Sequence, residues 1–162
     1  RLNGLDELAL EELAGVVHAI LMRGFTNTCF VIMPFADEFK PVYDDAIKPA
    51  LESKGLQPVR TDRLAHVGNL IPAIHQGIRH CYFAIVDTTG DRPNVMYELG
   101  MAHAQNKPVI LLRHACGDGS LSQAPFDIQT ENILGYDHRN TQDLRDLRRR
   151  LEDRISGLLG SN

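Results

Sequence analysis

The sequence is poor in cysteine, and the cysteines that it has form no pattern. Its 162 residues include three, Cys29, Cys81 and Cys116, which make an odd count with no close pair. A disulfide framework needs paired cysteines, and a structural zinc site needs cysteines or histidines at short, regular spacings. Neither is indicated, and the seven histidines show no ligand spacing, so we predict no metal and no cofactor. The composition fits a reducing, cytoplasmic compartment.

Long apolar runs and an excess of basic residues are also missing. No run approaches the ~20 apolar residues that cross a bilayer, and the N-terminus lacks the pattern of a signal peptide. The net charge of -4 argues against a nucleic-acid surface, which normally needs a basic face. The densest basic run, 148–150, alternates with acidic residues at helical spacing, as is typical of a solvated helix face. We therefore expect neither a membrane nor a nucleic acid as partner.

The first 24 residues predict an amphipathic helix that precedes the main domain. Apolar residues recur at helical spacing from Leu5 to Leu21, with Asn3 as the N-cap and Gly24 as the end. This helix could pack on the domain's own sheet, pair with a second copy, or lead in from an upstream domain. We favour packing or dimerisation because the apolar stripe is wide. The chain begins with Arg1 rather than Met, which suggests a longer, multidomain parent chain.

From residue 25 to 162, apolar strands alternate with amphipathic helices. Continuous apolar runs predict strands at 28–33, 56–60, 81–86, 108–112 and 132–136. Helical stripes predict helices at 38–53, 69–80 and 141–159, with another that starts near Asn94, and Pro49 predicts a kink or break in the first of these. Buried strands that alternate with helices indicate a parallel sheet covered on both faces. We predict one α/β domain, a flavodoxin-like three-layer sandwich with a five-stranded parallel sheet in the order 2-1-3-4-5, plus the extra N-terminal helix.

In this strand order, the chain changes direction between the first and third strands, where such sheets bind ligands. Pro34 and Phe35 would form one lip of this crevice, and Asp87 would begin the other. Residues after the second and fourth strands converge on the same edge: Arg60, Asp62, Arg113 and His114. Carboxylates, an aromatic ring and a guanidinium suit a nucleoside or nucleotide, with the base against Phe35 and the sugar between Asp87 and Glu98. No phosphate-binding loop of the P-loop kind is present.

Glu98 lies on the apolar stripe of the helix that follows Asp87. Val95, Leu99 and Ala102 recur at the i, i+4, i+7 spacing, and Glu98 falls within their stripe. A carboxylate buried without a partner is driven towards its neutral form, so Glu98 must have donors nearby or face a cleft. Two interpretations stay open: a catalytic or ligand-binding carboxylate favoured by the helix dipole, and a structural Glu bonded to free backbone N–H groups.

Three blocks, Phe30–Phe35, Asp87–Gly90 and Asn94–Ala104, carry a resemblance to a known family. They resemble the nucleoside 2-deoxyribosyltransferase-like superfamily, and especially its bacterial members with a Toll/interleukin-1 receptor-like (TIR-like) domain. The resemblance covers about residues 28–137, and Tyr-Glu-Leu-Gly at 97–100 is its most specific part. It implies that Glu98 attacks the anomeric carbon to form a glycosyl-enzyme, while Asp87 orients the sugar or helps to protonate the base. Substrate contacts are then expected from Phe35, Arg60, Asp62 and Asn94.

Two departures from that family leave the function open. The transferases typically complete their site near the C-terminus of a neighbouring subunit, whereas this chain ends in an amphipathic helix and Gly160-Ser161-Asn162. Pro34-Phe35 also replaces the small, glycine-bearing loop of several hydrolase relatives. The leading hypothesis is N-glycosidic bond cleavage or transfer on a nucleoside or nucleotide. The alternatives are a TIR-like NAD hydrolase, acting as the effector domain of a defence protein, and a non-catalytic nucleotide-sensing module of a larger protein. We also predict a homodimer through the first or last helix.

Overall fold

The structure is a computed structural model that describes residues 27–60, 70–115, 121, 125 and 132–160. Within these ranges, five strands form one sheet in the order β2-β1-β3-β4-β5, and all four pairings are parallel. The strands are β1 (Thr28–Ile32), β2 (Gln57–Arg60), β3 (Phe83–Asp87), β4 (Val109–His114) and β5 (Leu134–Tyr136). The predicted fold class and strand order are confirmed. The helix expected over residues 1–24 lies outside the described residues.

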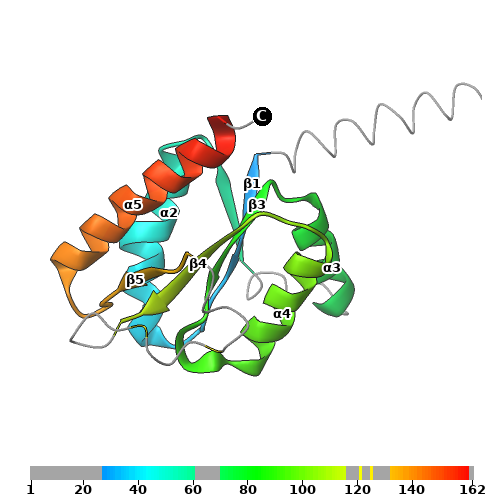
Figure 1. The fold of residues 1–162 in the computed structure, drawn as a ribbon, viewed down its shortest axis with the longest axis horizontal. Helices are drawn as coiled ribbons and strands as arrows, with labels where there is room; N and C mark the ends of the chain where they lie inside the picture. The colour runs from blue at the N-terminus through cyan, green and yellow to red at the C-terminus, as the bar shows by residue number, and fades with distance from the viewer. Residues whose placement is uncertain (1–26, 61–69, 116–120, 122–124, 126–131, 161–162) are drawn as a thin grey trace, which may run out of the picture.

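Helices cover both faces of the sheet and so complete three layers (Figure 1). One face carries α2 (Lys48–Glu52) and α5 (Thr141–Gly160), and the other carries α3 (Leu70–His80) and α4 (Pro93–Ala104). Successive strand residues point to opposite faces, so Ile85 joins the core under α2 and α5 while Val86 joins the core under α3 and α4. The central strands β1 and β3, which are buried at every position, therefore read as nearly continuous apolar runs. Within the described ranges, no helix is long and apolar enough to cross a membrane.

The connection from β1 to β2 is less regular than the single helix predicted for 38–53. It consists of a 3-10 turn, η1 (Asp37–Phe39), a π-helix, η2 (Val42–Ile47), and then α2. A π-helix has a wider turn than an α-helix: here the N–H of Lys48 bonds to the carbonyl of Tyr43, five residues back. Pro49 has no N–H to donate, so regular α-helical bonding cannot continue through it. The irregularity expected at Pro49 thus takes the form of a wide turn just before it.

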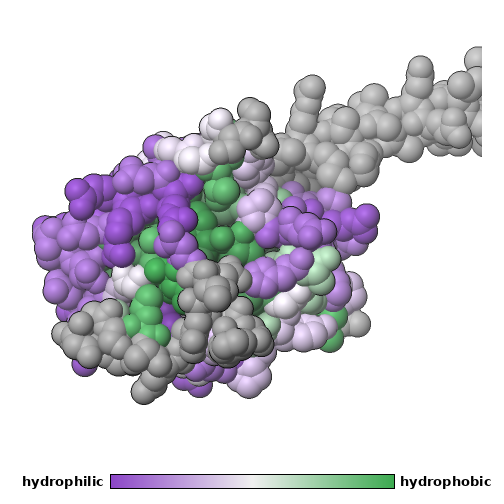
Figure 2. Space-filling view, in the orientation of Figure 1, coloured by the Kyte–Doolittle hydropathy of each residue, from purple (hydrophilic) through white to green (hydrophobic). Residues whose placement is uncertain are grey.

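The apolar stripe of the closing helix α5 (Thr141–Gly160) is buried against other elements of the same chain. Leu144, Leu147, Leu151 and Ile155 are buried, and α5 contacts β5, η2 and α2. The outer face of α5 is strongly hydrophilic (Figure 2) and includes an ion pair between Arg148 and Glu152. The stripe of the last helix is therefore not available for the predicted dimer. Dimerisation through the first helix stays a prediction, because that helix lies outside the described residues.

Gly77 marks a close approach of α3 to the sheet. A Cβ atom at this position would overlap the ring of Phe30, which is fully buried in β1. We predict that Gly77→Ala lowers the free energy of unfolding by about 1–3 kcal/mol through overpacking. Urea denaturation measures this change. Gly100→Ala in α4 is the matched control, since a Cβ there meets no atom within 4 Å, and it should stabilise by about 0.5–1 kcal/mol. Equal effects of the two substitutions would contradict the overlap.

Candidate functional site

The carboxyl ends of the strands bring polar side chains to one edge of the sheet. Asp87 ends β3, Arg113 and His114 end β4, and Arg60 ends β2. The sequence analysis placed Asp87, Arg113 and His114 after their strands, and this was wrong. The ladder continues further than the apolar runs do, because β3 pairs with β4 as far as Asp87 and β4 pairs with β5 as far as His114. These three residues are therefore held by the sheet itself rather than by loops.

Asp87 is fully buried, and both of its carboxylate oxygens accept hydrogen bonds. Oδ1 accepts from the backbone N–H of Thr89 at 3.0 Å and from its hydroxyl at 2.5 Å. Oδ2 accepts from the hydroxyl of Tyr136 at 2.5 Å. The Thr89 hydroxyl accepts in turn from the backbone N–H of His114 at 2.8 Å. This network, hereafter the Asp87 network, joins the ends of β3, β4 and β5.

Burial dominates the electrostatics of the Asp87 network. It raises the pKa of Asp87 above the ordinary value of 3.8, and the hydrogen bonds from Thr89 and Tyr136 oppose this rise without cancelling it. Burial and the neighbouring Asp87 carboxyl group also raise the pKa of Tyr136, so its phenol stays protonated and donates. A direct contact of Asp87 with a sugar, as expected from the sequence, would require this network to open.

Arg113 holds the loop between β3 and α4. Its buried guanidinium donates to the carbonyl of Thr88 at 2.8 Å and to both carboxylate oxygens of Asp91, at 2.7 and 3.1 Å. Gly90 and Asp91 have φ angles of 74° and 48°, in the left-handed region that glycine adopts without strain and aspartate tolerates. The bidentate pair thus fixes the 3-10 turn η4 (Thr89–Asp91), so that α4 starts at Pro93.

Glu98 is 5% exposed in the second turn of α4. The expectation that it shares a buried stripe is confirmed, because Val95, Leu99 and Ala102 pack in the core under α3 and α4. Asp87 instead bonds to Tyr136, which belongs to the core under α2 and α5. Asp87 thus contacts the core under α2 and α5, whereas Glu98 lies on a helix that covers the opposite face of the sheet.

Phe35 and Arg60 line the same pocket, of about 220 Å³, beyond the ends of β1 and β2. The Phe35 side chain is 51% exposed, and the Arg60 guanidinium lies 4.5 Å from the centre of the Tyr43 ring. Sites for drug-sized ligands usually measure about 300–1,000 Å³, so this pocket suits one ring or one charged group of a larger ligand. Of the other predicted contacts, Asn94 is exposed at the start of α4, and Asp62 lies outside the described residues.

The sequence analysis missed Tyr136, Asp137 and His138 at the end of β5. Their importance depends on the pairing of β5 with β4, which brings them beside His114. The sequence did contain one sign of these residues: the polar pair Asp137-His138 directly follows the fifth predicted strand. That strand ends at the edge of the sheet where the other polar residues were expected to converge. A single short strand of three residues gives little pattern from which to read that register.

Comparisons with known proteins give similarity to solved structures but no match in sequence. No protein-family model matches the chain, and no curated protein sequence matches it. Among solved structures, the chain is similar to a CMP N-glycosidase, BcmB, from Clostridium botulinum, with 21% sequence identity and a TM-score of 0.48. The match covers 74% of this chain and 97% of that protein. At this identity and TM-score the likeness carries no argument about activity, which has to come from the site itself.

We predict a pH-dependent stability effect at Asp87. Its folded-state pKa is raised, so its contribution to stability is fully present below the unfolded pKa of about 3.9 and is lost as the pH rises through the folded value. Asparagine keeps an acceptor for Thr89 and can donate an N–H to the Tyr136 oxygen. The free energy of unfolding of wild type minus that of Asp87→Asn should therefore fall as pH rises above about 4. Urea denaturation at a series of pH values measures this difference, and a constant or rising difference would contradict the prediction.

Proposed function

We propose that this chain cleaves or transfers the N-glycosidic bond of a nucleoside or nucleotide, with Glu98 as the nucleophile. The observation that carries the proposal is the burial of the Glu98 carboxyl group on the helix that starts at the switch point between β1 and β3. Carboxyl groups in such desolvated positions are concentrated at functional sites. The switch point is also where open α/β sheets bind ligands.

The proposed chemistry follows the retaining pathway for glycosidic bonds. The Glu98 carboxylate forms a bond to the anomeric carbon, and the bond from that carbon to the base nitrogen breaks. The base leaves with the bonding electron pair and takes up a proton. Water or a second base then attacks the same carbon and releases Glu98. Water as the acceptor gives hydrolysis, and a base gives transfer.

The pocket beside Phe35 supplies the proposed substrate contacts. The exposed Phe35 ring offers a face on which a base can stack, and Arg60 lines the same pocket with a positive charge suited to a phosphate group. Asn94, exposed at the start of α4, and Asp62 complete the proposed set. For Asp87 we propose the orienting role, exerted through Thr89 and Tyr136, because no part of its own side chain is exposed.

Incubation with a panel of nucleosides, nucleoside monophosphates and NAD, followed by chromatography, tests the proposal. Wild type should release free base from at least one nucleoside or nucleotide. Glu98→Gln should lose activity by on the order of 10³-fold or more, because the amide is not a nucleophile. Glu52→Gln is the matched control, since Glu52 is exposed and pairs with Lys48 on α2. It should retain full activity.

Other outcomes of this experiment separate the alternatives. Release of nicotinamide alone, and only after assembly into oligomers, would favour a TIR-like NAD hydrolase. Nucleotide binding that survives Glu98→Ala, without any product, would favour the sensing module. Activity that persists in a folded Glu98→Gln variant would disprove the role of Glu98. Thermal unfolding of each variant establishes that it is folded.

Phe35 gives a separate prediction about substrate binding. Stacking of a base on an aromatic ring contributes about 1–3 kcal/mol. Phe35→Ala should therefore raise KM by about tenfold or more and change kcat by less, while Phe35→Tyr, which keeps the ring, should stay close to wild type. Steady-state kinetics on the substrate identified by the panel measures both. An unchanged KM for Phe35→Ala would place the base elsewhere.

A further inference from the structure

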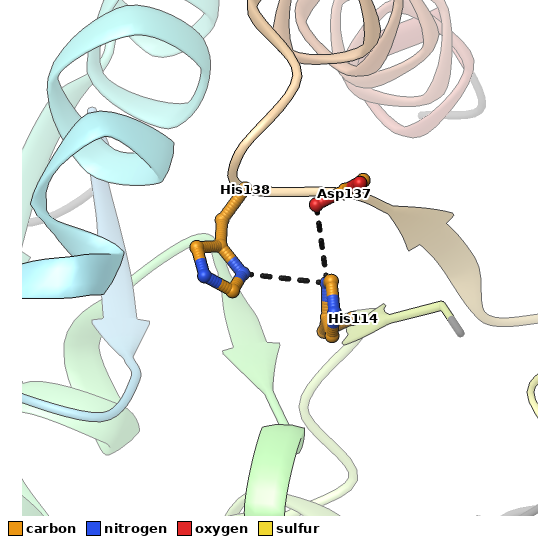
Figure 3. Close-up of side chains that lie close together, drawn as sticks. All are labelled: His114, Asp137 and His138. Carbon is orange, nitrogen blue, oxygen red and sulfur yellow. Dashed lines mark hydrogen bonds and ion pairs between the residues drawn. The ribbon is translucent and has the colours of Figure 1, made fainter. Parts of the chain in front are cut away.

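Three side chains that commonly bind metals meet at the ends of β4 and β5. His114 ends β4, and Asp137 and His138 directly follow β5. Nδ1 of His138 lies 3.3 Å from Nδ1 of His114, and Oδ1 of Asp137 lies 3.9 Å from the same nitrogen. Figure 3 shows both side chains directed towards His114. One ligand atom from each residue lies within 4.8 Å of the others, and all three residues are half-buried.

The distances fit a small four-coordinate ion. Zn²⁺ binds imidazole nitrogen at about 2.0–2.1 Å and carboxylate oxygen at about 2.0–2.2 Å in tetrahedral geometry, which places neighbouring ligand atoms about 3.3 Å apart. The two histidine nitrogens already have this separation. Asp137 lies 3.9 Å from Nδ1 of His114 and has to move closer to reach this separation. A half-buried side chain at the surface can do so by rotation.

A shared proton is the competing explanation for the short contact between the two histidines. A neutral imidazole has one protonated nitrogen, so the two Nδ1 atoms form a hydrogen bond only if one of them carries the proton. The carbonyl oxygen of Tyr136 lies 3.1 Å from Nδ1 of His114 and can only accept, so in the metal-free protein this nitrogen carries the proton and donates it. A cation has to displace that proton, as metals generally do when they bind histidine, and it would then be bound by both nitrogen lone pairs and the carboxylate together.

The surroundings hold the two rings in place. The ring of Phe39 packs against His138 with centroids 5.3 Å apart, and the ring of Tyr136 meets His114 edge-on at 6.0 Å. Ligands held in this way lose little further freedom on binding an ion. Arg139 is a neighbouring cation, and its Nε lies 3.4 Å from Oδ1 of Asp137. Its side chain is 70% exposed, so it can turn towards water when an ion takes its place.

We propose that His114, Asp137 and His138 bind a divalent transition-metal ion, with zinc the best geometric fit. Imidazole ligands favour such ions over Mg²⁺ and Ca²⁺, which prefer oxygen ligands. Three protein ligands leave a fourth position for water or for an oxygen atom of a small anion. The ion would join the ends of β4 and β5 beside Tyr136, and hence beside the Asp87 network. This proposal is independent of the role of Glu98.

Calorimetric titration of the untagged, chelator-treated full chain with Zn²⁺ tests the site. Wild type should bind one ion at this site, and His138→Gln and Asp137→Asn should each bind it at least about tenfold more weakly. His80→Gln is the matched control, because His80 lies on α3 and bonds to Gln76 away from this edge, and it should bind as wild type does. Mg²⁺ should not bind. Co²⁺ should give the intense visible bands of four-coordinate cobalt with wild type and lose them with His138→Gln.

Two results would overturn the proposal. Equal Zn²⁺ affinity in wild type and in both ligand variants would mean that any bound ion is adventitious and lies elsewhere. The lack of stoichiometric binding to wild type would leave the shared proton as the explanation of the contact. Thermal unfolding of the metal-free variants checks that they fold. Asp137→Asn has the same shape as wild type and keeps the acceptor for Arg139, so it preserves the test if His138→Gln does not fold.

Discussion

The buried carboxyl group of Asp87 is the constraint on which the carboxyl edge of the sheet depends. Removing a carboxyl group from water is unfavourable unless donors replace the water, and here Thr89 and Tyr136 supply them. Because these donors come from the loop after β3 and from β5, satisfying Asp87 fixes both in place. β5 is only three residues long and, among the described residues, pairs with β4 alone, so its side-chain contacts help to fix its position.

The same edge is divided into two halves by the loop that follows Asp87. On the β4 and β5 side, polar side chains mostly satisfy one another, as in the bidentate pair of Arg113 with Asp91. On the β1 and β2 side, Phe35 is exposed and the pocket next to it is open. Groups already bonded to one another give rigidity, while exposed rings and charges are available to a ligand. The division thus separates the Asp87 network from the proposed nucleotide pocket, while the proposed metal site lies beside that network on the β4 and β5 side.

The sequence was sufficient to predict the strand order and the buried position of Glu98, for simple physical reasons. Strands covered on both faces read as continuous apolar runs, and crossover rules leave few orders for five of them. Glu98 stood out because a charged residue interrupted a helical stripe. The bond between Tyr136 and Asp87 could not be predicted, since it depends on strand register and on which face each side chain meets. The same applies to His114 and His138, which lie 24 residues apart and meet only because β4 and β5 pair.

Asp87 and Glu98 belong to elements in different layers of the fold. Asp87 ends a strand and bonds to Tyr136 in the core under α2 and α5, whereas Glu98 lies on α4, whose residues Val95, Leu99 and Ala102 pack in the core under α3 and α4. The chain between them, from Thr88 to Arg92, includes the turn that Arg113 holds and leads into the first turn of α4. The Asp87 network and the Arg113 pair therefore help to set the position of the first turn of α4, the helix that carries Glu98.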